Sequence, residues 1–436
     1  MNAAVFCGVR MNRDDKMYDI GLVANYLAKN YGAHFTQFAL FATLKEFGFS
    51  VLMIERPKDA PASVRMQTPV LFENIPYPPG VFAKLYPNLE EMKELNTFCK
   101  VFVTGSDQLF NNNLYRGYNR FMCQGYVADN RYKMSYAASF GHDHIWGSVE
   151  DTMEETFYLK RFHAFSVRED SGVRVCKKYF GIRAEHVLDP VFLCPMQIYE
   201  RMVEYGSKYI PRKNYLFAYI LDADKEKEKV LRYCADKYHL EEIRAISDAV
   251  KPKNEQTDLW SINTLTDAKC EAWLAHIAKS SFYITDSFHG MCFAILFRKD
   301  FLVIVNKDRG ETRFTSVAKA LGLEDRLCYD FQDLEDRLNT VSAIDYDAVF
   351  SRLEKEQERC KNYLRTQVME GLQFYKEGPL LFKETSCWED YKKREEKRTY
   401  IRRKIQGGIR CLREHDFFYT VRRFFEKFIN KRKETS

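Results

Sequence analysis

The sequence YDIGLVANYLAKNYGAHFTQFALFATLKEFGFSVLMI, at residues 18–54, sets the fold class of this 436-residue chain. The apolar run Tyr18–Ala24 is typical of a buried strand, and Ser50–Ile54 of a second one. Between them, apolar residues recur with helical spacing over Phe35–Phe47, and Gly48 ends the pattern. Strand, helix and strand within about forty residues form a βαβ unit, which predicts a parallel sheet.

The same alternation of strands and helices continues beyond this unit. The first half contains further predicted strands at residues 100–104, 134–138 and 165–167. After a polar linker at 206–214, a second series is predicted, with strands at 215–221, 242–246, 282–285 and 301–305 and helices at 225–238, 270–279, 291–297, 316–321 and 348–371. Two α/β series in succession predict two doubly wound domains, residues 1–205 and 206–387, followed by a tail at 388–436.

The charge of the chain is unevenly distributed. The formal net charge is +6, from 67 basic and 61 acidic residues. Residues 389–436 hold 16 basic and 8 acidic residues, a net charge of +8, so the preceding chain carries −2. A uniformly basic surface is therefore excluded, and we expect no nucleic-acid partner. The positive excess belongs to the tail.

The cysteines and the N-terminus indicate a cytoplasmic protein. The 12 cysteines are spaced singly, without a C-x-x-C pair, which argues against a zinc ribbon or a redox motif. The N-terminal apolar run is too short for a signal peptide, and no stretch reaches the roughly 18 apolar residues of a spanning helix. We expect no metal and no resident cofactor.

Ligands of such sheets bind beyond the carboxyl ends of the strands, and polar clusters stand at these ends. His289 belongs to the segment Asp286–Gly290, between a predicted strand and an apolar helix. Because a helix N-terminus favours anions, this segment can bind one. The alternative interpretation is structural: Asp286 or Ser287 caps the helix, and His289 is hydrogen-bonded. Arg168 directly follows the strand at 165–167, where alone it is typical of a surface arginine. Because they belong to different halves, we expect Arg168 and His289 to face each other across the interdomain cleft.

Three further clusters are open to a structural or a functional interpretation. Residues 105–108 (GSDQ) can form a capped turn, or offer Asp107 as a base and Gln108 as a hydrogen-bonding partner of a sugar. The basic loop at 307–313 can be solvated, or its arginines can bind phosphate or carboxylate bidentately. The turn at 30–33 (NYGA) contains a glycine that allows close backbone approach. His142 and His144 lack the accompanying ligands of a metal site.

Several common enzyme motifs are absent from the sequence. It contains no G-x-x-x-x-G-K-[ST], no complete G-x-G-x-x-G and no G-x-S-x-G. P-loop ATPases, simple NAD dehydrogenases and α/β-hydrolases therefore lose their main support.

Read together, six short motifs occur in a fixed order. They are Asn30-Tyr31-Gly32-Ala33 with Gln37, Gly105-Ser106-Asp107-Gln108, Tyr136-Ala137-Ala138-Ser139-Phe140-Gly141, Ser166-Val167-Arg168-Glu169, Asp189-Pro190-Val191-Phe192 and Thr285-Asp286-Ser287-Phe288-His289-Gly290. This series resembles the polysaccharide pyruvyltransferase family over roughly residues 18–330. The first turn is one residue longer than the family's NYGA-x-L-Q, and Leu109-Phe110 stands where the family often has a tryptophan; both differences concern the acceptor side.

The resemblance implies two Rossmann-like domains in a GT-B-like arrangement. It also implies transfer of pyruvate from phosphoenolpyruvate to two hydroxyls of a sugar, which forms a cyclic ketal during biosynthesis of a cell-surface polysaccharide such as a capsule. We expect the acceptor saccharide to be lipid-linked. With this resemblance, we expect His289 to act as the acid and Asp107 to activate or orient the sugar hydroxyl. We expect phosphoenolpyruvate to be bound by Arg168, Arg313, Arg309 and Ser287, and the acceptor sugar by Gln108 and Asn30.

Other functions fit the same pattern. The nearest is a GT-B glycosyltransferase with a nucleotide-sugar donor. A second is another reaction of the same superfamily, including one with a non-sugar acceptor. A third is a non-catalytic scaffold at a membrane-bound assembly, for which Arg168 and His289 would be dispensable.

The basic tail combines an apolar stripe with cationic residues. Phe417, Val421, Phe424, Phe425 and Phe428 recur with helical spacing, and arginines and lysines supply the remainder. A helix of this composition is typical of the interface of an anionic membrane leaflet, so we expect peripheral attachment to the inner face of the cell membrane. The alternative is that the stripe packs on the protein's own body or on a second copy in a homo-oligomer.

Overall fold

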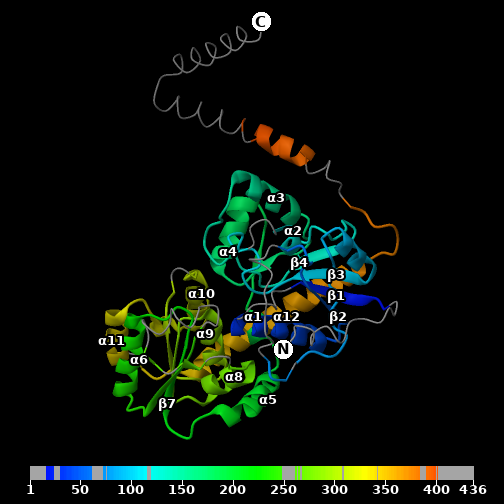
Figure 1. The fold of residues 1–436 in the computed structure, drawn as a ribbon. Coiled ribbons are helices and arrows are strands. Elements are labelled where there is room, and N and C mark those ends of the chain that lie inside the picture. Colours follow the sequence, from blue (N-terminus) through cyan, green and yellow to red (C-terminus); the bar gives the residue numbers. More distant parts are fainter. Residues whose placement is uncertain are drawn as a thin grey trace, which may run out of the picture.

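The computed structural model describes residues 16–23, 30–60, 72–74, 76–114, 119–247, 261–262, 264–265, 268–306, 309–340, 342–382, 389–398 and 400. They form two α/β halves, each built on a sheet whose strands all pair in parallel (Figure 1). The N-terminal sheet has the strand order β2-β1-β3-β4, and the C-terminal sheet has the order β12-β11-β10-β7-β8-β9. The doubly wound organisation predicted from the sequence is confirmed.

The elements of the N-terminal half follow the predicted alternation. Its strands are β1 (Tyr18–Val23), β2 (Val51–Ile54), β3 (Cys99–Thr104), β4 (Tyr132–Ser135), β5 (Ser166–Val167) and β6 (Glu185–His186). Its helices are α1 (Tyr31–Glu46), η2 (Glu91–Thr97), α2 (Asn119–Met122), α3 (Val149–Leu159), α4 (Asp170–Val175), η3 (Cys176–Phe180) and η4 (Pro190–Phe192).

The C-terminal half has the larger sheet. Its strands are β7 (Tyr215–Ile220), β8 (Glu242–Ser247), β9 (Thr264–Leu265), β10 (Phe282–Thr285), β11 (Phe301–Ile304) and β12 (Leu327–Cys328). The helices from here on are α5 (Met196–Gly206), η5 (Ser207–Tyr209), α6 (Lys225–Lys237), α8 (Cys270–Lys279), α9 (Phe288–Leu296), α10 (Thr312–Leu321), η6 (Glu324–Arg326), α11 (Phe331–Thr340) and α12 (Tyr346–Phe374).

Helix α1 lies between the two halves. Every residue from Tyr31 to Leu44 is buried, so the helix has no solvent face. On the C-terminal side, the ring of Phe35 lies 5.0 Å from that of Phe293 and 5.5 Å from that of Trp273, measured between centroids. Aromatic packing of this kind adds about 0.5–1.5 kcal/mol per pair beyond area burial, so α1 helps to hold the halves together.

Two helices pack against the half that lies across the predicted domain boundary from most or all of their sequence. A Cβ on Gly206 of α5 would lie 2.0 Å from the carbonyl oxygen of Glu271, so the absence of a side chain lets α5 pack closely on α8 of the C-terminal half. Helix α12 begins beside α9 and ends on the N-terminal sheet, where a Cβ on Gly371 would lie 2.7 Å from Val101 Cγ2. Figure 1 shows α12 and α1 between the halves. Through α5 and α12, each half therefore contributes a helix that packs on the other half.

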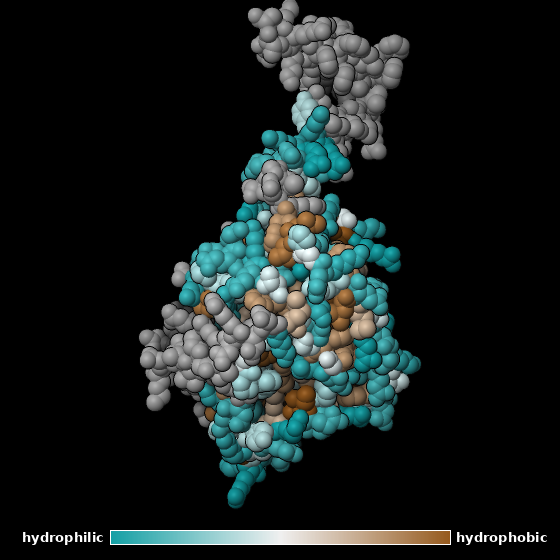
Figure 2. Space-filling view, turned by 90° about the vertical axis from the view of Figure 1, so that its right-hand side faces the viewer, coloured by the Kyte–Doolittle hydropathy of each residue, from teal (hydrophilic) through white to brown (hydrophobic). Residues whose placement is uncertain are grey.

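The surface and the start of the tail carry mainly polar residues. The face shown in Figure 2 is largely hydrophilic, with hydrophobic side chains in separate groups. Residues 389–398 are helical, and the ring of Tyr391 lies 5.4 Å from that of Phe157 on α3. The predicted stripe at 417–428 lies outside the described residues. Among the helices described, none has the length and apolar character needed to cross a bilayer.

Candidate active site between the two halves

A cluster of charged side chains gathers at the carboxyl ends of strands from both halves. Asp107 follows β3, Arg168 follows β5 and Asp189 follows β6; His289 lies in the first turn of α9, after β10. Arg168, Asp189 and His289 are nearly or completely buried, and the carboxylate of Asp107 is partly accessible. Parallel sheets bring such ends to one edge, which explains how residues far apart in the sequence meet here.

Arg168 is the centre of this cluster. Its Nη1 donates to Asp189 Oδ2 at 2.6 Å, and its Nη2 donates to Asp107 Oδ1 at 3.0 Å. Nη1 also lies 3.2 Å from His289 Nε2, and the guanidinium lies over the ring of Phe288, 4.8 Å from its centroid. Arg168, from the N-terminal half, thus contacts two carboxylates of its own half and His289 of the C-terminal half.

Asp189 was not among the predicted site residues, although its motif was recognised. Its Oδ2 accepts from Arg168 and lies 3.4 Å from His289 Nε2, while its Oδ1 accepts from Thr36 Oγ1 at 2.7 Å. Burial alone would raise the pKa of this carboxyl, but the positive charges of His289 and Arg168 outweigh burial and hold the pKa well below its ordinary value. Asp189 is therefore a buried anion in contact with both Arg168 and His289. The sequence signal was the Asp-Pro pair at residues 189 and 190, soon after strand β6.

His289 is held in place by the first helix of the other half. Ser287 caps α9, accepting from the backbone N–H of Gly290 at 3.3 Å, so His289 lies in the helix and not in the preceding turn. A Cβ on Gly32 would lie 2.1 Å from His289 Nδ1 and 2.6 Å from its Cβ. The glycine of the NYGA turn is thus required because the imidazole occupies the space of a side chain.

Asp107 has an unusual backbone conformation. Its φ of 87° lies in a region that residues other than glycine rarely adopt, and strain of this kind is concentrated at functional sites. Burial opposes ionisation, but the charges of Arg168, His289 and Arg313 hold the pKa of Asp107 below its ordinary value. The carboxylate is ionised at neutral pH, as a group that accepts or orients a hydroxyl proton must be.

Arg313 is a second buried cation on the C-terminal side. Its Nη2 donates to the carbonyl oxygen of Arg309, and its Nε has no hydrogen-bond partner in the part of the chain that the structure describes. Burial and the neighbouring charge of Arg168 lower its pKa to about 10. With its oxygen towards the guanidinium, the amide of Gln108 accepts from Arg313 at 3.0 and 3.2 Å. A buried guanidinium without an ion pair among the described residues favours an anionic ligand.

The other predicted binding residues have local partners. Arg309 forms a bidentate pair with Asp222, at 2.5 and 3.0 Å, and its guanidinium does not join the cluster. Ser287 caps α9, and Asn30 caps α1 by accepting from the N–H of Ala33 at 3.3 Å. Their predicted roles in substrate binding stay predictions.

Glu169, the neighbour of Arg168, is another buried acid that the sequence did not single out. Its Oε1 accepts from Ser139 Oγ at 2.9 Å and from the N–H of Phe140 at 3.0 Å. Burial raises its pKa, although Arg168 opposes the shift. Glu169 therefore links the segment after β5, to which it belongs, to the loop after β4. Among the described residues, no group of three or more side chains could hold a metal ion.

Residues 30–308 match the profile of the family described as Polysaccharide pyruvyl transferase. The chain belongs to this family. The matched segment contains all six motifs, so Asp107, Arg168, Asp189 and His289 lie within it. Family membership implies an enzyme of polysaccharide pyruvylation, which agrees with the resemblance seen in the sequence. Among curated proteins, none matches the chain.

Solved structures of similar fold come from sugar-processing enzymes. UDP-N-acetylglucosamine 2-epimerase from Rickettsia bellii aligns with a TM-score of 0.50 and 10% identity, over 81% of this chain and 96% of that one. A Thermobaculum terrenum O-GlcNAc transferase mutant aligns with a TM-score of 0.45 and 9% identity, over 84% and 70%. At such identities the likeness concerns the fold alone, two α/β domains in a GT-B-like arrangement.

Proposed function

We propose that the protein transfers pyruvate from phosphoenolpyruvate to two hydroxyls of one sugar and forms a cyclic ketal. The observation that carries the proposal is the meeting of Arg168 and His289, 3.2 Å apart, in a buried cluster that also contains two carboxylates. This cluster combines anion binding with acid–base groups, the two requirements of the reaction.

The donor is a small molecule with a carboxylate and a phosphate. Arg313 supports its binding, since this buried guanidinium has a lowered pKa and an anion beside it would supply the missing countercharge. The N-terminus of α9 adds backbone N–H groups and a favourable dipole on the same side. We propose that Arg313 and Arg168 bind the donor, and that Arg309 assists from its pair with Asp222.

The chemistry requires one acid and one base. His289 is proposed to protonate the methylene carbon of phosphoenolpyruvate, which leaves an oxocarbenium-like centre at the neighbouring carbon. A sugar hydroxyl adds there and loses its proton to Asp107; the second hydroxyl then displaces the phosphate, which leaves with that hydroxyl's proton. The products are the ketal and inorganic phosphate. Asp189 acts through His289 and Arg168 as a positioning residue.

The acceptor is proposed to be a lipid-linked saccharide of a capsule-like polysaccharide, held in part by Gln108 and Asn30. The basic tail supports this proposal, since it suits attachment to the inner face of the cell membrane. Removal of residues 412–436 is expected to release the protein from vesicles with anionic lipids while the body stays folded. Unchanged vesicle binding after truncation would exclude the tail as the anchor.

The test is phosphate release from phosphoenolpyruvate in the presence of candidate glycolipids, with mass spectrometry for the added pyruvyl group. His289→Ala should reduce turnover nearly to zero, whereas His239→Ala, at an exposed histidine outside the cluster, should not change it. Wild-type phosphate release by His289→Ala would disprove the assignment. Release of UDP from a nucleotide sugar, without consumption of phosphoenolpyruvate, would instead support a glycosyltransferase.

A further inference from the structure

An exposed tryptophan lies on the loop between β4 and α3. Trp146 is 38% exposed, which is unusual for so large an apolar side chain. Its ring contacts two histidine rings, His144 at 4.7 Å and His142 at 5.7 Å between centroids, and neither stacks parallel on the indole. The side chains of His144 and Asp143 are exposed and lie in hydrogen-bond contact beside it, with His144 Nδ1 3.0 Å from Asp143 Oδ1. The indole ring of Trp146, with polar side chains around it, is thus exposed to solvent.

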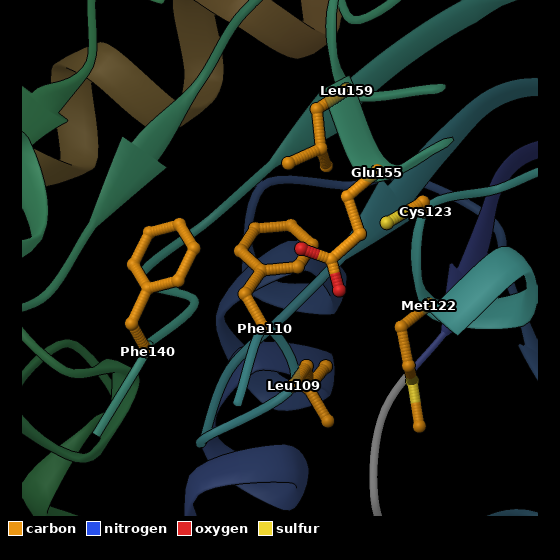
Figure 3. Close-up of a pocket in the computed structure, with 7 residues that line it drawn as sticks. All are labelled: Leu109, Phe110, Met122, Cys123, Phe140, Glu155 and Leu159. Carbon is orange, nitrogen blue, oxygen red and sulfur yellow. The ribbon is translucent and has the colours of Figure 1, made fainter. Parts of the chain in front are cut away.

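The backbone of Trp146 is fixed to the protein core. Its N–H donates to Asn112 Oδ1 at 3.0 Å, and Asn112 Nδ2 donates to the carbonyl oxygen of Trp146. Asn112 is itself buried and hydrogen-bonds with Glu155, whose carboxyl points into an apolar cavity beside Phe110 (Figure 3). The exposed ring is therefore held on a rigid support, which lowers the entropic cost of binding a ligand.

The loop that carries Trp146 begins at the candidate active site. A Cβ on Gly141 would lie 2.3 Å from Gln108 Oε1, so the loop starts against the residue that contacts Arg313. A Cβ on Gly310 would lie 1.8 Å from the carbonyl oxygen of Gly141, so the C-terminal half closes on the same point. From Gly141 to Trp146 the chain spans at most about 17 Å. A short oligosaccharide covers that distance.

We propose that Trp146, with His142 and His144, forms a stacking subsite for a sugar ring of the acceptor, away from the ring that receives pyruvate. The inference rests on the proposed function. A sugar ring has an apolar C–H face that packs on an indole and hydroxyls that hydrogen-bond with the polar surround. Leu109 and Phe110, which follow Gln108, are buried and offer no such surface. The subsite selects acceptors with more than one sugar.

The test compares Trp146→Ala and Trp146→Phe with Tyr205→Ala, a matched control at a 59% exposed aromatic residue on α5. Binding to a printed array of defined oligosaccharides is measured without phosphoenolpyruvate, and the strongest binder is then titrated. Trp146→Ala should weaken its affinity about tenfold, Trp146→Phe less, and Tyr205→Ala not at all. With an active glycolipid, the KM of the acceptor should rise and the KM of phosphoenolpyruvate should stay constant.

The outcomes separate this inference from the proposed function. If no oligosaccharide shows binding that depends on Trp146, the subsite is disproved, whatever the activity. If binding depends on Trp146 but phosphoenolpyruvate is not consumed, the subsite stands and the proposed reaction fails. If pyruvylation proceeds and Trp146→Ala leaves the acceptor KM unchanged, the reaction stands and the subsite is disproved.

Discussion

The two halves of the protein bring opposite net charge to the cluster of side chains between them. The N-terminal half contributes Arg168 with its two carboxylates, Asp107 and Asp189, one cation and two anions, so this group has a formal net charge of −1. The C-terminal half contributes His289 and the buried Arg313, and Asp286, three residues before His289, accepts from the backbone of residues 221 and 222 and from Lys227. The comparison shows that the charges of the N-terminal side pair with one another, whereas Arg313 on the C-terminal side has no ion pair among the described residues.

Replacement of Arg168 should have the largest effect. Arg168→Met leaves two buried carboxylates without their cation, which typically costs about 3–5 kcal/mol of unfolding free energy, and it should abolish turnover. Urea unfolding and phosphate release measure the two effects. A variant with native stability would show that the carboxylates do not depend on this cation.

The pH dependence of stability should differ in sign between the halves. Burial raises the pKa of Glu155, in the N-terminal half, to about 8. The unfolded chain ionises this group near its ordinary value of 4.5, so stability should fall as the pH rises from there to about 8, by on the order of a few kcal/mol. Glu155→Gln should remove this slope and stabilise the protein most at pH 8, as measured by urea unfolding across pH.

His276 in the C-terminal half provides the matched control. Burial lowers its pKa to about 4, and its ring stacks on Phe217 at 4.9 Å. As the pH falls, the unfolded chain binds the His276 proton before the folded chain does. The stability that the neutral, buried His276 contributes is therefore lost as the pH falls from about 6.5 towards 4. His276→Gln should flatten the acid side alone. If both variants changed the same side of the profile, the assignment of slopes to the halves would be wrong.

A methyl group on Gly32 should disturb the contact between the halves. In Gly32→Ala the new Cβ overlaps His289, so the imidazole must move away from Arg168, and we expect kcat to fall more than about tenfold. The control is Gly32→Ala combined with His289→Ala, which removes the overlap. That double variant should be as stable as His289→Ala alone; additional destabilisation would place the clash elsewhere.

Replacement of Arg313 should have the smallest effect and the opposite sign on stability. Because Arg313 is a desolvated cation without an ion pair among the described residues, Arg313→Met should leave the unfolding free energy unchanged or raise it. The KM of phosphoenolpyruvate should rise about tenfold, since one charge-assisted contact is lost. Equal destabilisation by Arg168→Met and Arg313→Met would contradict the contrast between the halves.

The regular elements were largely predictable because their signals are local. The predicted helix at 270–279 and strand at 282–285 coincide with α8 and β10. Helix starts were less well predicted, since α9 begins at Phe288 and not at 291, where its cap at Ser287 places it. The predicted linker at 206–214 contains the last residue of α5 and the helical turn η5. Hydrophobic spacing indicates an element, but the cap decides its first residue.

The candidate site was predictable only in part, because its geometry depends on tertiary contacts. Arg168 and His289 were expected to face each other, and the structure places them in contact. The importance of Asp189 was missed, since its partner Thr36 is 153 residues away in the sequence. The expected role of Arg309 at the donor stays a prediction, and its pairing with Asp222, 87 residues away, was not predicted from the sequence. No local pattern specifies such pairings.

The 29-residue helix α12 connects the two halves. Near its start, Arg352 Nη1 donates to the carbonyl oxygen of Leu321 at 2.7 Å, and near its end, Gln367 accepts from Tyr132 Oη at 2.9 Å. The helix is about 44 Å long and is anchored to one half at each end. The two halves therefore cannot slide apart while both anchors hold. A change in the distance between the halves must therefore bend α12 or break one of these hydrogen bonds.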